Sequence, residues 1–176
     1  MIVRGKAKKQ KITKSAMTRA GSSASDFLLK LELESNPESL CLVRATIERA
    51  TETLHFEPAE TRAIVRAVDE ALANVVRHAY KGQRGQPIQL TCRRLRSADT
   101  EARAKGIEII LQDSGVALDP AKLKGRPLDE IRPGGLGLHF MRQSMDKVEF
   151  SRSQGQNQLR LVKYLAPAKP EKTQGD

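Results

Sequence analysis

The stretch Glu70-Ala-Leu-Ala-Asn74-Val-Val-Arg-His78-Ala-Tyr80 is the second half of a helical pattern that begins near Pro58. Apolar residues recur along this pattern at helical spacing and predict one buried stripe, made of Ile64, Val65, Val68, Ala71, Leu72, Val75, Val76 and Ala79. At about 100° per residue, Glu70, Asn74 and Arg77 fall on the opposite side of the helix, with His78 at the edge of the stripe. An acid, an amide and an imidazole therefore lie one turn apart.

Glu70 and Asn74 occupy positions i and i+4, where side chains lie roughly 5–6 Å apart and can act on one bound ion or one water. On the exposed face of an amphipathic helix, however, such residues are more often simply solvated. The helix therefore indicates a functional site only if other segments bring matching groups to it.

The net charge of +10 is concentrated at one end of the chain. Residues 1–25 contain seven basic residues and no acidic residue, and residues 166–176 sum to zero, which leaves +3 for residues 26–165. We expect a basic disordered arm at 1–25, one folded domain at 26–165 and a polar tail at 166–176. Nucleic-acid binding is therefore expected, if at all, only through the arm.

The two cysteines, Cys41 and Cys92, lie far apart without metal-type spacing. We expect both to be reduced thiols in apolar surroundings. The sequence contains neither an apolar run long enough to span a membrane nor the apolar middle of a signal peptide. These features predict a cytoplasmic protein without a membrane anchor.

Alternating apolar residues predict strands at 27–34, 88–93 and 107–112, and two more around 148–150 and 159–165. In the first, Phe27, Leu29, Leu31 and Leu33 are expected on one face. Helices are predicted from about 36 to 54 and from 58 to 80, and another follows a group of glycines near 137. Residues 97–105 are expected to form a polar loop and 154–157 a turn.

Two further segments are of a kind that binds ligands. The predicted strand at 107–112 runs into Asp113-Ser114-Gly115, which delivers a carboxylate to the rim of the sheet. After a long aperiodic stretch, residues 116–133, which we interpret as a lid, Pro133-Gly-Gly-Leu-Gly-Leu138 opens a helix. Glycines before a helix let backbone N–H groups approach a phosphate. Each signal is weak alone.

Taken in order, the three segments resemble the GHKL ATP-binding superfamily, and in particular its branch of bacterial anti-sigma-factor serine kinases. The resemblance covers about residues 27–165 and rests on Glu70 to Tyr80, Asp113-Ser-Gly115-x-x-x-Asp119-Pro120, Gly134-Gly-Leu-Gly-Leu138 and Met145-Asp146-Lys-Val148. It implies a two-layer α/β sandwich of the Bergerat type, with a mixed, mainly antiparallel sheet and three helices on one face. Only the basic arm precedes Phe27, so no helical hairpin carrying a phosphoacceptor histidine is expected.

The resemblance also implies roles for individual residues. Asn74 would coordinate the Mg²⁺ that bridges the phosphates of ATP, and Glu70 would take the proton from an attacking serine hydroxyl. Asp113 would accept a hydrogen bond from the adenine amino group, beside a pocket wall kept thin by Gly115. His78 would either brace the helix end or line the site. The remaining nucleotide contacts implied are those of Gly134, Gly135, Leu136, Gly137 and Leu138.

The function implied first is an ATP-dependent serine/threonine-protein kinase that acts as an anti-sigma factor in partner switching. It would phosphorylate an anti-anti-sigma (STAS-type) protein and sequester a sigma factor. Members of the branch commonly pair as homodimers, which the sequence neither supports nor excludes here. The alternative is a non-catalytic binding module in which ATP only shapes the surface that sequesters a partner. Retention of both Glu70 and Asn74 favours the enzyme.

Overall fold

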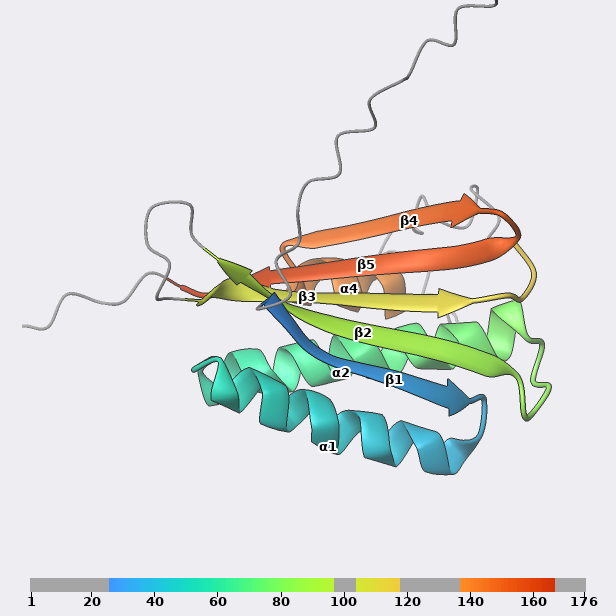
Figure 1. Ribbon diagram of the computed structural model, residues 1–176, viewed down its shortest axis with the longest axis horizontal. Coiled ribbons are helices and arrows are strands. Elements are labelled where there is room, and N and C mark those ends of the chain that lie inside the picture. Colours follow the sequence, from blue (N-terminus) through green and yellow to red (C-terminus); the bar gives the residue numbers. More distant parts are fainter. Residues whose placement is uncertain (1–25, 97–103, 118–136, 167–176) are drawn as a thin grey trace, which may run out of the picture.

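The computed structural model describes residues 26–96, 104–117 and 137–166. They form a five-stranded sheet with helices packed against one face, which confirms the predicted two-layer α/β architecture (Figure 1). The predicted arm, most of the predicted lid, nearly all of the polar tail and residues 134–136 lie outside the described residues. No helix in the described ranges is long and apolar enough to cross a membrane.

The sheet comprises β1 (Phe27–Glu34), β2 (Pro87–Arg96), β3 (Ala104–Asp113), β4 (Lys147–Ser153) and β5 (Gln156–Tyr164), in the order β1-β2-β3-β5-β4. All pairings between these described strands are antiparallel, so the predicted mixed sheet is wrong for this part of the chain. β1 is followed by two helices that run in opposite directions (Figure 1). The second helix brings the chain back to the end of the sheet where β1 ends, and β2 begins there. Strands β3 and β4 run in the same direction, but β5 separates them.

Three α-helices cover one face of the sheet: α1 (Pro37–Thr53), α2 (Pro58–Asn74) and α4 (Gly137–Ser144). The predicted stripe of α2 is confirmed, because Ile64, Val68 and Leu72 are at most 2% exposed. It packs on apolar rows of the sheet, of which one runs in register through Leu31, Leu90, Leu111, Leu159 and Phe150. Burying each large aliphatic side chain stabilises the fold by about 1.5–3 kcal/mol.

The long helix changes its winding at the end that carries the motif. After Asn74, it continues as η2 (Val75–Ala79), a π-helix in which the Tyr80 N–H donates to the Val75 carbonyl at 2.9 Å. A π-turn of this length buries the same apolar side chains as an α-helical turn would. The apolar periodicity therefore did not predict the change of winding. Such turns are frequently found at functional sites.

Several boundaries and burial predictions need correction. Phe27 does not share the face of Leu29, because the register shifts between them and leaves Phe27 48% exposed. Cys41 is exposed on α1, whereas Cys92 is buried, which raises its pKa to about 12. The last turn contains only Gln154 and Gly155, both with positive φ, and the predicted loop at 97–105 is too long because β3 begins at residue 104.

Candidate functional site

The helix that carries the first motif presents its polar residues half-exposed at one side. The Glu70 carboxylate lies 3.9 Å from Nη2 of Arg77, which is on the same face as predicted. The Asn74 amide makes no hydrogen bond with any described residue. His78 is exposed and likewise forms no hydrogen bond within the described ranges, so it does not brace the helix end in that way. Among the described residues, the polar side-chain atoms of Asn74 and His78 are therefore available to a ligand.

The third motif meets this face where α4 begins. Gly137 lies so close to Glu70 that a Cβ atom at this position would overlap the Glu70 carboxylate. Leu138 is half-buried and packs against the core. The absence of a side chain at Gly137 permits this approach, and the fold brings the start of α4 to the acid of α2, 67 residues earlier in the chain.

The second motif meets the C-terminal end of the same helix. A Cβ atom on Gly115 would lie 2.6 Å from the carbonyl carbon and oxygen of Ala79. The neighbouring Val116 N–H donates to the Ala79 carbonyl at 2.9 Å. The Asp113 turn is thus fastened to the end of η2, and the three motifs lie along one helix.

Asp113 is held in this turn by a buried polar network. Its Oδ1 accepts hydrogen bonds from the Gly115 N–H at 2.9 Å and from the Asn157 Nδ2 at 2.7 Å. Oδ2 accepts no hydrogen bond from any described residue. Asp113 is 6% exposed, so this oxygen offers an acceptor of fixed direction.

Sequence reasoning missed three residues that build this turn: Tyr80, Asn157 and Arg152. The Tyr80 hydroxyl accepts from the Ser114 N–H at 3.0 Å and donates to the Pro87 carbonyl, which joins η2 to both strand ends. Burial raises the pKa of Tyr80, and the nearby charge of Asp113 adds to the rise, against the Ser114 hydrogen bond. Tyr80 was part of the quoted motif, but nothing in the pattern assigned it a partner.

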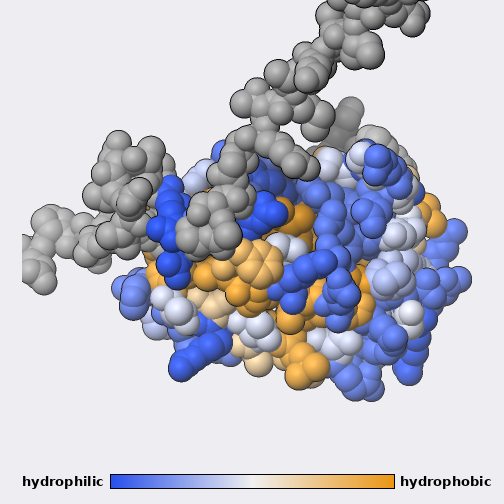
Figure 2. All heavy atoms as spheres, in the orientation of Figure 1, coloured by the Kyte–Doolittle hydropathy of each residue, from blue (hydrophilic) through white to orange (hydrophobic). Residues whose placement is uncertain are grey.

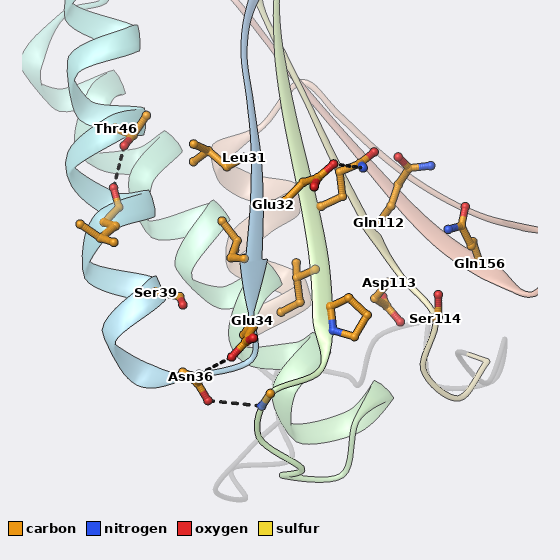
Figure 3. A pocket seen from close by; sticks show the side chains of 16 residues that line it. Leu31, Glu32, Glu34, Asn36, Ser39, Thr46, Gln112, Asp113, Ser114 and Gln156 are labelled. Carbon is orange, nitrogen blue, oxygen red and sulfur yellow. Dashed lines mark hydrogen bonds between the residues drawn. The ribbon is translucent and has the colours of Figure 1, made fainter.

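The described surface also contains a hollow of about 720 Å³ on the side of β1 and α1 (Figure 3). It extends from Thr46 and Ser39 on α1, past Asn36, to Asp113 and Ser114 at the end of β3. Glu70, Asn74 and His78 do not line it. The hollow therefore adjoins the candidate site at the Asp113 turn only.

A metal ion bound by the described residues would have few protein ligands. The described residues contain no group of three or more His, Cys, Asp or Glu side chains that could hold a metal. Mg²⁺ does not need one, since it keeps several waters and is commonly held by one or two protein oxygens together with substrate phosphates. The unpartnered Asn74 amide oxygen fits that mode of binding.

Comparisons with known proteins agree with this architecture. A family model described as "Histidine kinase-like ATPase domain" matches residues 33–163. The chain is 29% identical over 146 residues to the serine-protein kinase RsbW of Bacillus pumilus. This alignment covers 78% of this chain and 86% of the relative. It is 35% identical over 103 residues to the serine/threonine-protein kinase BtrW of Bordetella bronchiseptica, which covers 56% of this chain and 67% of the relative.

Two solved structures share the fold. One is a chain from the SiaB–SiaC complex of Pseudomonas aeruginosa, with a TM-score of 0.57 and 16% identity over 78% of this chain and 89% of that chain. The other contains the RsbU and RsbW domains of a Mycobacterium tuberculosis protein, with a TM-score of 0.53 and 16% identity. This likeness covers 78% of the present chain and 31% of that longer chain. At these identities, the structures show the fold alone.

Proposed function

The chain belongs to the histidine kinase-like ATPase family, and from this premise we propose that it is an ATP-dependent serine/threonine-protein kinase that regulates a partner protein in the cytoplasm. The observation that supports this most strongly is the convergence of three distant segments along one helix. Gly137 lies against Glu70 within α2, and the Asp113 turn is fastened to Ala79 at the end of η2. A nucleotide bound along this helix has its base at Asp113 and its phosphates at Glu70 and Asn74.

Each end of the site then has a distinct task. Oδ2 of Asp113 accepts a hydrogen bond from the adenine amino group, and Gly115 keeps this wall of the site thin by letting the Asp113 turn lie directly against Ala79. Asn74 holds Mg²⁺ with its amide oxygen, and His78 lines the site beside it. The metal neutralises charge on the phosphates during transfer. Backbone N–H groups at the start of α4, including those of Gly137 and Leu138, face the phosphates.

The chemistry of transfer falls to Glu70. Its carboxylate takes the proton from the serine hydroxyl of the partner as that oxygen attacks the γ-phosphorus, and the bond from this phosphorus to the β-phosphate oxygen breaks. The products are a phosphoserine on the partner and ADP. Arg77, 3.9 Å from Glu70, lies beside this step.

We infer the partners from the resemblance of the sequence motifs rather than from the geometry of the site. The substrate is an anti-anti-sigma (STAS-type) protein, and the unphosphorylated and phosphorylated forms of this substrate decide whether a sigma factor is sequestered.

The kinase acts as a homodimer that pairs at the outer edge of β1, an edge strand beside the hollow and the 72% exposed Leu42. Sedimentation of the Leu42→Glu variant as a dimer of unchanged affinity would exclude this face.

The test is calorimetric titration with ATP and Mg²⁺, followed by transfer of labelled phosphate to a serine-bearing partner. The unaltered protein is expected to bind and to transfer, and Asn74→Ala is expected to weaken binding only when Mg²⁺ is present. Gln89→Ala, on the opposite face of the sheet, is the matched control. Binding without transfer to any such partner would favour the non-catalytic binding module, and absence of binding would overturn both.

A further inference from the structure

The outer strands of the sheet reach the base end of the proposed site through Asn157. Asn157 lies opposite Asp113 in the β3–β5 pairing and opposite Arg152 in the β4–β5 pairing. It is 4% exposed, although it was expected to lie in a turn. Asn157 therefore connects the exposed edge strand β4 to the buried carboxylate of Asp113.

Arg152 holds the oxygen end of the Asn157 amide. Its Nη1 donates to Oδ1 of Asn157 and, at 3.0 Å, to the Gly115 carbonyl. A guanidinium has only donors, so the atom of Asn157 that faces it must be the amide oxygen. The amide NH₂ is then directed at Asp113 Oδ1, at 2.7 Å, and at the Val116 carbonyl, at 3.1 Å.

This orientation decides what Asp113 can offer to a ligand. Oδ1 receives two donors, the Asn157 NH₂ and the Gly115 N–H. Oδ2 remains as the acceptor, and its direction is fixed because Oδ1 is fixed. If the Asn157 amide were reversed, its oxygen would face the carboxylate and repel it, and the acceptor would lose its position.

We propose that Arg152 is a positioning residue for base selection, which fixes the Asn157 amide so that Asp113 presents an acceptor to the exocyclic amino group of the bound base. The inference rests on the proposed nucleotide-binding function and extends it to a side chain on the outermost strand. A base with an amino group at this position is favoured, and a base with a carbonyl oxygen there is rejected by the carboxylate.

The experiment compares dissociation constants for ATP and inosine triphosphate, which has a carbonyl oxygen in place of the amino group. Arg152→Leu is expected to weaken ATP binding about tenfold, the scale of one lost charge-assisted hydrogen bond, and to leave inosine triphosphate binding nearly unchanged. Arg152→Lys retains a donor and is expected to recover most of the preference. Lys147→Leu, at another exposed cation of β4, is the control and should change neither constant.

A merely structural role for Arg152 gives a different pattern. Both nucleotides would then weaken by the same factor, and the melting temperature of the nucleotide-free protein would fall in proportion. That result, or an unchanged ATP preference in Arg152→Leu, would overturn the positioning role while the nucleotide site stands. If the unaltered protein bound neither nucleotide, the proposed function itself would fail, and this inference with it.

Discussion

At the base end of the site, Asp113 is 6% exposed, and groups from η2, β4 and β5 hold its turn. At the phosphate end, by contrast, the Asn74 amide has no hydrogen-bond partner among the described residues. The first arrangement is assembled by folding. The second is completed only by the nucleotide and its metal ion. Substitutions at the phosphate end should therefore change turnover without changing stability, and substitutions at the base end should change affinity, stability or both.

The largest effect is expected for Glu70→Gln at the phosphate end. Loss of the general base should slow phosphoryl transfer by about 10²–10⁴-fold. The melting temperature should not move, because Glu70 is partly exposed and its ion pair with Arg77 at 3.9 Å is a surface pair worth about 0–1 kcal/mol. Single-turnover transfer from labelled ATP measures the rate, with the exposed Glu48→Gln as control. A rate within tenfold of the unaltered protein would remove Glu70 from this role.

Gly137→Ala tests the same end through the backbone. The added methyl group would overlap the Glu70 carboxylate, which is flexible and must turn away. A displacement of about 1 Å at a reacting group can cost roughly 10²-fold in rate, so transfer should fall by up to that factor while ATP affinity changes less. In the Glu70→Gln background, the same substitution should have no further effect on the rate. An additive loss in the double variant would mean that Gly137 acts independently of Glu70.

Asp113→Asn sharpens the comparison from the base end. The new amide can turn its oxygen to Asn157 and Gly115, which keeps the network, and it then presents NH₂ where Oδ2 was an acceptor. ATP affinity should fall by about 10–150-fold, the equivalent of 1.5–3 kcal/mol for a hydrogen bond to a charged group. Inosine triphosphate should now bind better than ATP, as calorimetry would detect. If the variant still preferred ATP to inosine triphosphate, the base would have to bind elsewhere. Asp69→Asn on α2 is the control.

The sequence predicted well the parts of this site that depend on local pattern. The stripe of α2, the strand that ends at Asp113 and the helix that begins at Gly137 each follow from periodicity or from glycine chemistry within about ten residues. These features suffice to place Glu70 and Asn74 on one helix face. They also give the two-layer fold, since each element has one apolar face to bury.

The parts that failed depend on pairing between distant strands. Asn157 sits in a polar stretch next to Gly155, and only the β3–β5 register places it opposite Asp113. Placing Arg152 opposite Asn157 requires a second register, that between β4 and β5. Cys41 was expected in apolar surroundings, and alternation placed Phe27 on the face of Leu29, although α1 and the shifted start of β1 turn them outward. Local pattern contains no information on these partners.

The smallest effect is expected from Tyr80→Phe, which tests whether the base end is indeed assembled by folding. The variant leaves the Ser114 N–H and the Pro87 carbonyl without their partner and should lose about 1–3 kcal/mol of stability at neutral pH. Its ATP affinity should fall only a few-fold, because Asn157 still holds Asp113.

The pH dependence of this variant separates the tyrosine from other groups. Because burial raises the pKa of Tyr80, its stabilising contribution is complete below the ordinary tyrosine pKa of about 10 and is lost as the pH rises from there through the folded-state value. Cys92, with a pKa of about 12, destabilises both proteins alike in alkali. Denaturant unfolding between neutral pH and strong alkali should therefore show a shallower alkaline loss in Tyr80→Phe than in the unaltered protein. Parallel curves would mean that Tyr80 ionises as readily in the folded chain as in the unfolded one, and that its hydroxyl does not help to hold the turn at the base end.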